Sequence, residues 1–434
     1  MDADGRGTAP ERPPTRTRRG VPTLPLVATV LTFAVGFAQK WPCHYAGWPW
    51  DTRLAFGSYC YSDIPILFRG RGLIDGAFPY APQPAGPPLE YPVGSGYLMD
   101  LTARLSRLFT PGADEATAAQ AYFLVNVVVL LALALATVWA VHLVLRRTGG
   151  RTRDALLVAA APTLALAGTI NWDLLAVAAA VLAVLAWAYD RPLLAGAMIG
   201  LGTAAKLFPL FLLGPLLLLC LRDRRLRDFA RTLAAAVAVW LVLNAPVMVL
   251  YPDGWWEFWR FNAAREADFG ALWYALQLLG APVPAVNEVA LGVLVLFLLG
   301  VAALARYARR PPTLAQLGFL TVAAFLLTNK VYSPQYVLWL LPLLVLARGH
   351  VPGRRVLRDW ALWQAAEVLH WVAVWRYLGE ALTADWQYPA AILIRVAVTA
   401  YLCGQVVRDV LTASAGAPAG ARPAALPTPA PQPA

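Results

Sequence analysis

Lysine is scarce in this 434-residue chain, since only three of its 36 Lys and Arg residues are lysine. Lys206 and Lys330 stand at breaks between hydrophobic segments, and Lys40 ends the first such segment. A charge at a break within a membrane is unfavourable unless it faces a polar cavity or a partner. An ammonium is a compact point charge that suits a phosphate. We therefore interpret Lys206 and Lys330 as candidates for binding phosphate. Snorkelling to the membrane surface is the alternative, chiefly for Lys40.

A long loop, predicted over residues 41–120, faces the same side as these breaks. It is rich in aromatic side chains, carboxylates and prolines, and Asp63 begins its most helix-like stretch. Such a loop directly after the first hydrophobic segment indicates a site at the membrane surface. An aspartate at the start of a helix also favours helix formation, so Asp63 has a structural as well as a chemical interpretation. Asp51, Asp75 and Glu90 are the other candidate carboxylates of this loop.

Composition predicts an all-α polytopic membrane protein. The chain is 59% hydrophobic and 14% charged, whereas soluble domains are about 25% charged. A bilayer needs about 20 apolar residues per helix, and the hydrophobic segments predict about twelve transmembrane helices within residues 21–411. Residues 1–20 and 412–434 are polar or Ala/Pro-rich, and we expect them to be disordered cytoplasmic tails.

Basic clusters predict the orientation, because they concentrate in cytoplasmic loops. With twelve spans, all clusters and both termini fall on the cytoplasmic side, and the net charge of +11 reflects topology rather than nucleic-acid binding. Residues 94–109 form an amphipathic pattern, which predicts a helix lying flat on the outer surface. Segment 21–39 is interpreted as an anchor, with a cleaved signal peptide as the alternative. The clusters lie at 16–19, 146–153, 222–231, 306–310 and 348–358.

A second large outer loop, 251–286, combines several tryptophans with charged side chains such as Arg265. Trp256 and Arg265 are candidates for contacting a sugar acceptor, although tryptophans also concentrate at membrane interfaces without a ligand. In the first loop, Cys43 and Cys60 would form a disulfide in an oxidising compartment, or remain two free thiols.

The outer segments resemble glycosyltransferase family 87, the polyprenol-phosphate-mannose-dependent mannosyltransferases. The stretch from Asp63 to Tyr80 is similar to the first-loop signature of that family, and Glu90-Tyr91-Pro92 to its Tyr-Pro motif. Asn171 matches a second motif, Lys206 and Pro209 a third, and the segment 330–341, with its Tyr-Ser-Pro-Gln-Tyr core, a fourth. The motifs follow the family's order over most of the membrane core. Two positions depart from it, with Pro92-Val93 for Pro-Pro and Thr169-Ile170 for Gly-Gln.

The resemblance implies a GT-C-type bundle with interfacial helices, and a hexosyltransferase reaction that inverts the anomeric centre. The donor would be a sugar, expected to be mannose, on a polyprenyl phosphate, and the acceptor a glycolipid, glycan or protein. Asp63 would take the acceptor proton, and cations would stabilise the leaving phosphate. Neither a metal nor another cofactor is expected. The phosphate candidates are Lys206, Lys330, Arg69 and Arg71, and the substrate candidates are Glu90, Tyr91, Asn171, Asp173, Tyr332, Gln335, Tyr336, Trp256 and Arg265.

Ionisable residues also occur within the last two hydrophobic segments. Glu367 and His370 lie three apart on one predicted helix, and Arg395 lies early in the next. Intramembrane ionisable groups are functional candidates by default. Two interpretations are open. These groups either neutralise one another as a structural clamp or contact the substrate.

Absent motifs and the distribution of polar groups distinguish two classes of function. The sequence contains no Gly-rich phosphate loop, nucleophile elbow or His/Cys metal spacing. A carrier or flippase for a lipid-linked saccharide would use the same cations. It would also place its polar groups near the membrane midplane within internal repeats. Here these groups gather at the outer edge, which favours an enzyme in the cell membrane with its active site outside.

Overall fold

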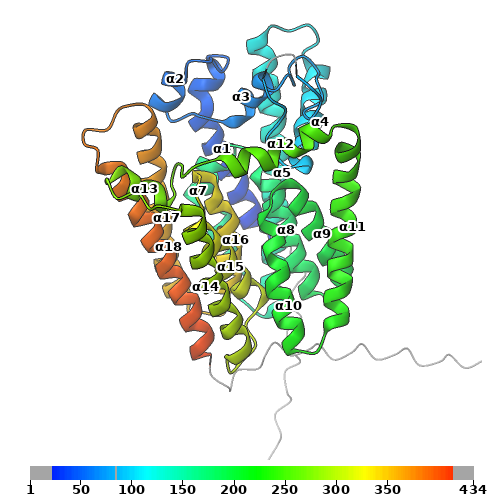
Figure 1. Cartoon of the computed structure of the whole chain (residues 1–434), viewed down its shortest axis with the longest axis vertical. Coiled ribbons are helices and arrows are strands. Elements are labelled where there is room, and N and C mark those ends of the chain that lie inside the picture. Colours follow the sequence, from blue (N-terminus) through cyan, green and yellow to red (C-terminus); the bar gives the residue numbers. More distant parts are fainter. Residues whose placement is uncertain (1–21, 84–85, 414–434) are drawn as a thin grey trace, which may run out of the picture.

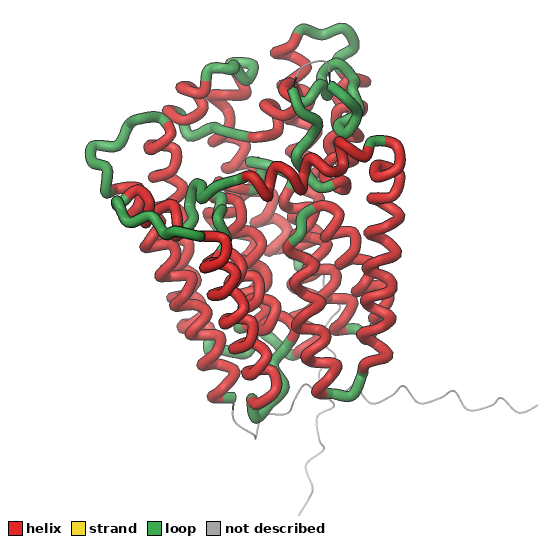
Figure 2. Tube along the Cα trace, in the orientation of Figure 1, coloured by secondary structure: helices red, strands yellow, loops and turns green. Residues whose placement is uncertain are grey.

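All regular structure in the described part of the chain is helical. The computed structural model describes residues 22–83 and 86–413, so the predicted tail 1–20 and nearly all of the tail 412–434 lie outside the described residues. Long helices form a bundle, and shorter helices cross one end of it (Figures 1 and 2). The prediction of an all-α fold is confirmed.

Among the described residues, five helices are long and apolar enough to cross a membrane, by length and composition. Two of them bury only 17% of their most apolar window, so most of that apolar surface is available to lipid tails. A helix that is apolar on all sides suits a bilayer rather than water. The chain is a multi-pass membrane protein. The five helices are α1 (Thr23–Tyr45), α5 (Glu115–Thr148), α11 (Leu226–Leu250), α14 (Val286–Tyr307) and α18 (Gln387–Thr412).

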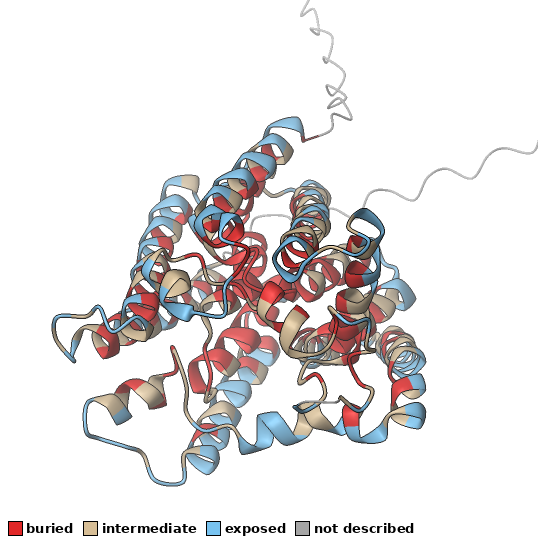
Figure 3. Cartoon of the chain, turned by 90° about the horizontal axis from the view of Figure 1, so that it is seen from above, coloured by how far each residue is buried: buried red, intermediate tan, exposed pale blue. Residues whose placement is uncertain are grey.

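Shorter apolar helices form the centre of the bundle, where buried residues concentrate (Figure 3). Helix α9 packs closely on α11, because a Cβ atom at Gly196 or Gly200 would overlap a carbonyl of α11. Small residues allow helix backbones to approach in this way inside membranes. The central helices are α8 (Asp173–Ala188), α9 (Pro192–Ala205), η2 with α10 (Phe208–Leu212 and Leu213–Arg222), α15 (Leu314–Thr328), and η3 with α16 (Pro334–Tyr336 and Val337–Ala347). Helix α17 (Gly353–Leu378) completes the bundle.

Two predicted segments differ from the helices observed. The hydrophobic stretch 155–170, which the sequence predicts as one of the transmembrane helices, is divided into α6 (Ala155–Ala159) and α7 (Pro162–Ala167), which follow η1 (Thr152–Asp154). Proline has no backbone N–H and clashes with the preceding turn, so it begins a helix rather than continuing one. Helix α1 continues six residues beyond the predicted end of its segment, to Tyr45, so the first loop is shorter than predicted.

Both large loops contribute helices to the same end of the bundle (Figure 1). The amphipathic segment forms α4, which buries Met99 and Ala103 but leaves Leu101 and Leu108 exposed. The exposed apolar side agrees with a position at a membrane surface, and that position stays a prediction. The loop helices are α2 (Thr52–Gly57), α3 (Asp63–Gly70) and α4 (Val93–Phe109), and then α12 (Pro252–Ala264) and α13 (Leu272–Leu278).

The basic clusters of separate loops join one another away from these helices. Asp190 pairs with Arg225 at 3.0 Å and with Arg147 at 3.9 Å. Arg222 donates hydrogen bonds of 2.7 Å to two carbonyls at the end of α14. These contacts place the clusters at 146–153, 222–231 and 306–310 at one end of the bundle, as the sequence pattern predicts. The cluster at 16–19 lies outside the described residues.

A buried ion network at that end yields a stability prediction. Arg348 pairs with Asp359 at 2.6 Å and with Asp409 at 2.7 Å, and its side chain is 1% exposed. Removing one member of a buried pair costs about 3–5 kcal/mol, so Arg348→Gln should lower the thermal unfolding midpoint in detergent. Arg358→Gln, which removes an exposed partner of Asp359, is the control. An equal loss in both variants would contradict the assignment.

Candidate active site

Asp63 begins α3 at the end of the bundle where both large loops lie. Ser62 caps the helix, since its hydroxyl accepts from Ile64 N at 3.2 Å and donates to Thr169 O at 2.8 Å. The backbone N–H of Asp63 donates to Ile170 O at 2.8 Å. Because Ser62 supplies the cap, the Asp63 carboxylate remains available for other contacts.

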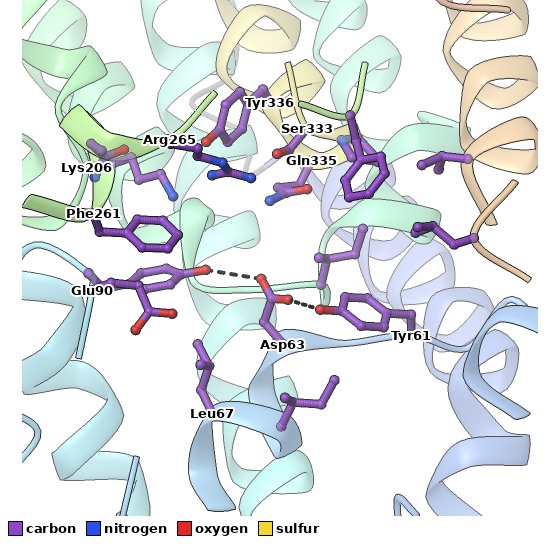
Figure 4. A pocket seen from close by; sticks show the side chains of 18 of the residues that line it. Tyr61, Asp63, Leu67, Glu90, Lys206, Phe261, Arg265, Ser333, Gln335 and Tyr336 are labelled. Carbon is purple, nitrogen blue, oxygen red and sulfur yellow. Dashed lines mark hydrogen bonds between the residues drawn. The ribbon is translucent and has the colours of Figure 1, made fainter. Parts of the chain in front are cut away.

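Two tyrosine hydroxyls hold the Asp63 carboxylate. Tyr61 donates to one oxygen at 2.7 Å, and Tyr91 donates to the other at 3.1 Å (Figure 4). Asn171 donates to the Tyr91 hydroxyl at 3.4 Å. Burial, and then the charge of Asp63, raises the pKa of Tyr61 and of Tyr91 well above the ordinary value. Both phenols therefore stay protonated and act as donors.

The electrostatic surroundings of Asp63 favour a base. Burial raises the pKa of its carboxyl above the ordinary value, while the two tyrosine hydrogen bonds and the positive charge of Lys206 oppose this rise. A raised pKa brings a carboxylate closer to the range in which it accepts a proton effectively.

Asp63 has no cation within ion-pair distance, in contrast to other carboxylates nearby. Asp173 pairs with Lys206, Glu90 with Arg71, and Asp268 with Arg265. Within the described ranges, Asp63 forms no ion pair. Tyrosine hydroxyls hold its carboxylate without supplying a neutralising charge.

Lys206 occupies a box made by aromatic rings and a carboxylate. Its ammonium lies 3.1 Å from Asp173 Oδ1, 4.8 Å from the ring centre of Tyr91 and 5.5 Å from that of Tyr336. Trp339 donates to the other oxygen of Asp173 at 2.8 Å. Cations bind favourably over aromatic faces. The break after α9 thus presents a fixed ammonium, with 16% of its side chain exposed.

A cavity of about 410 Å³ brings Asp63 and Lys206 together. We call it the Asp63 cavity. Lys206, Arg265 and Gln335 lie across it from the Asp63 carboxylate (Figure 4). Of the predicted site residues, those that line it are Asp63, Lys206, Glu90, Tyr91, Gln335, Tyr336 and Arg265.

The walls of this cavity divide into polar and apolar parts. The polar part includes the carboxylates of Asp63 and Glu90 and the cations of Lys206 and Arg265. Most of the apolar side chains come from the first loop, from α12 with the segment after it, and from α17. Such walls suit a ligand with a polar head and an apolar tail. The apolar lining consists of Phe56, Ile66, Leu67, Pro92, Ile170, Phe258, Phe261, Phe269, Pro334, Val374, Trp375 and Leu378.

Three predicted site residues support the cavity from behind. Asn171 accepts from the backbone N–H of Asp173 at 3.0 Å, and the two orient Tyr91 and Lys206. Arg71 donates to Glu90 at 2.8 Å and does not line the cavity. These contacts make Asn171, Asp173 and Arg71 neighbours of the site rather than parts of its surface.

Four predicted residues do not belong to the Asp63 cavity. Lys330 lines a second cavity of about 310 Å³, and its ammonium donates to the carbonyl of Arg265. Arg69 pairs with Glu115 at 2.9 Å and donates to Gly47 O and Trp48 O. Tyr332 is buried against Arg395, and Trp256 is 52% exposed. Lys330 thus lines a neighbouring cavity, which shares Arg265 with the Asp63 cavity, and its ammonium turns toward the segment after α12. Its role in binding phosphate stays a prediction.

Several residues of the site were not singled out from the sequence. Tyr61 carries no motif of its own, and its role depends on the fold. Ser333 lies within the Tyr-Ser-Pro-Gln-Tyr core but was not among the predicted site residues. Phe258 and Phe261 belong to the aromatic run of the second loop, where Trp256 was chosen instead. The three-residue spacing of Phe258 and Phe261, which places side chains on one helix face, was the available signal.

Helix α1 fixes the chain just before Asp63. Cys43 and Cys60 form a disulfide. Lys40, which is fully buried, donates to Tyr61 O at 2.6 Å, and Gln39 donates to Tyr59 O. The segment that carries Tyr61 and Asp63 is thus attached to α1 by a covalent bond and two hydrogen bonds.

Two comparisons found proteins to which this chain is similar. The sequence model of glycosyltransferase family 87 matches residues 91–328, more than half of the chain. A solved structure of ArnT from Cupriavidus metallidurans bound to undecaprenyl phosphate is similar, with a TM-score of 0.47 and 16% sequence identity. The similarity covers 90% of this chain and 78% of that chain. The curated proteins include no match.

The disulfide predicts how firmly the first loop is held. Replacing both cysteines, Cys43→Ser with Cys60→Ser, removes the cross-link, and we expect severalfold faster hydrogen exchange of amides 58–63 in detergent. Exchange within α15, which lies in the core, should stay unchanged. Equal exchange of amides 58–63 in the variant and the parent protein would show that the hydrogen bonds from α1 hold this segment alone.

Proposed function

This chain belongs to glycosyltransferase family 87, and we propose that it moves a sugar from a polyprenyl-phosphate donor to an extracytoplasmic acceptor with inversion. The chain is thereby a membrane glycosyltransferase. Mannose is the proposed sugar, and Asp63 the proposed base. The proposed reaction uses no metal or other cofactor.

One observation carries this proposal. Asp63 faces a cavity that Lys206 also lines, and phenols hold its carboxylate, which has no ion-pair partner in the part of the chain that the structure describes. An attacking hydroxyl must lose its proton as its oxygen bonds to the anomeric carbon, and a positioned carboxylate can accept that proton. Tyr61 and Tyr91 orient the carboxylate for this step.

The departing group determines the role of the cations. As the acceptor oxygen attacks, the bond between the anomeric carbon and the phosphate oxygen breaks, and the polyprenyl phosphate leaves with the electron pair. Lys206 and Arg265 line the cavity across from Asp63, where they would stabilise the phosphate charge. Attack opposite the leaving phosphate inverts the anomeric centre, and the proton ends on Asp63.

The apolar half of the cavity supports a lipid-linked donor. Its aromatic side chains can bind a prenyl chain, while Glu90 and Gln335 present polar atoms to a sugar. A water-soluble donor would gain little from such a wall. The end that carries the cavity is proposed to face the exterior, because the basic clusters lie away from it.

The Asp63 base is tested by sugar transfer from polyprenyl-phospho-mannose in reconstituted membranes. Asp63→Asn retains the shape but cannot accept the proton, so transfer should fall by about 10²–10⁴-fold, the usual contribution of such catalysis. Asp75→Asn, an exposed carboxylate of the same loop outside the cavity, is the control and should retain transfer. Undiminished transfer by Asp63→Asn would remove Asp63 from the mechanism. Absence of transfer in the parent protein, together with movement of labelled lipid across the bilayer, would instead favour a carrier.

The pH dependence of transfer tests the environment of Asp63. The base works when deprotonated, so kcat/KM should rise with pH through a carboxyl pKa that burial has raised. Tyr61→Phe removes a hydrogen bond that lowers this pKa, and the acid limb should move to higher pH. Tyr59→Phe, a nearby ring stacked on Trp371, should leave the limb in place. A shift to lower pH in Tyr61→Phe would contradict the assignment.

A further inference from the structure

A buried ion pair between α17 and α18 lies outside the Asp63 cavity. Arg395 Nε donates to Glu367 Oε2 at 2.8 Å, and neither side chain is more than 1% exposed. The hydroxyl of Tyr332 donates to the other oxygen of Glu367 at 3.3 Å, and Trp363 Nε1 donates to it at 3.2 Å. The proposed reaction does not use this pair. Burying two charges is costly unless their hydrogen bonds are satisfied.

The remaining nitrogens of Arg395 reach the backbone of the cavity wall. Nη1 donates to Tyr332 O, and Nη2 donates to Ser333 O at 3.1 Å. The guanidinium also lies 3.5 Å from the ring centre of Tyr332. A planar guanidinium presents its donors in a rigid fork, so it fixes the two carbonyls relative to each other. Ser333 is the first residue of the wall that continues through Tyr336.

A second segment of the cavity wall packs against the loop that contains Tyr332. The backbone N–H of Asp268 donates to Lys330 O at 2.9 Å. A Cβ atom at Gly270 would lie 2.1 Å from Tyr332 O and 2.8 Å from Arg395 Nη1, so glycine permits this approach. Gly270 also has φ +78, which other residues rarely adopt. The segment that carries Arg265 and Phe269 thereby rests on the loop that Arg395 holds.

The wall connects Arg395 to Lys206. Tyr336 stacks on Trp339 at 3.9 Å between ring centres and lies 5.5 Å from the Lys206 ammonium. Trp339 in turn donates to Asp173, the ion-pair partner of Lys206. A shift of the carbonyls at Tyr332 and Ser333 would therefore displace Tyr336 from Lys206.

We propose that Arg395 is a positioning residue, which sets the Ser333–Tyr336 wall of the Asp63 cavity through two backbone carbonyls. Glu367 orients the guanidinium and balances its charge. This inference rests on the proposed function. A pair that only joined α17 to α18 would not need to satisfy the wall's carbonyls, and an apolar contact could replace it.

The test removes both charges together, as Arg395→Met with Glu367→Met. This variant leaves no unpaired buried charge, so its thermal unfolding midpoint should fall less than that of Arg395→Met alone. We expect kcat/KM for polyprenyl-phospho-mannose, per folded enzyme, to fall at least about tenfold, with KM rising more than kcat falls, because the wall contacts bound donor. Hydrogen exchange of amides 330–336 should become severalfold faster.

Arg348→Gln is the matched control, because Arg348 forms an equally buried ion pair away from the cavity. It should lose stability while KM and the exchange of amides 330–336 remain those of the parent protein. Parental values of KM, kcat and exchange in the double variant would overturn the positioning role, even where Asp63→Asn abolishes transfer. If the parent protein transfers no sugar, the proposed function fails, and the exchange measurement alone decides for or against the Arg395 role.

Discussion

The site depends on one constraint. The Asp63 carboxylate is removed from water but forms no ion pair with an opposite charge among the described residues. Lys206, Glu90 and Arg265 each have an ion-pair partner around the cavity, whereas Asp63 has two tyrosine hydroxyls. Phenols stabilise a carboxylate less than a cation would, so burial keeps its pKa raised. The carboxylate is held in place and yet remains able to take a proton.

The groups that surround Asp63 come from distant parts of the chain. Tyr61 comes from the stretch tied to α1, Tyr91 from the residues before α4, and Asn171 from the turn before α8. Each supplies a hydrogen bond, and Lys206 adds its charge from the break after α9. Helix α9, which ends at Ala205 just before Lys206, packs closely on α11 through Gly196 and Gly200.

Lys206 and Lys330 look equivalent in the sequence but have different surroundings in the structure. Lys206 and Lys330 are both rare lysines at outer breaks, and both follow the end of a helix. The Lys206 ammonium lies 3.1 Å from Asp173 Oδ1, and Lys206 lines the Asp63 cavity. Lys330 donates to the carbonyl of Arg265 and lines a different cavity. Their difference depends on which acceptor the packing places within reach, and no local pattern specifies that.

The sequence by itself determined the membrane class, the common side of the polar breaks, and the order of motifs that contains Asp63, Tyr91 and Lys206. These follow from hydrophobic length, charge distribution and residue type, which act locally along the chain. The tertiary structure decided that Tyr61 holds the base, that Arg71 stands behind Glu90, and that Arg395 reaches the carbonyls of the cavity wall. Hydrogen bonds and ion pairs act over about 3–4 Å, so they depend on packing between helices that are far apart in the sequence.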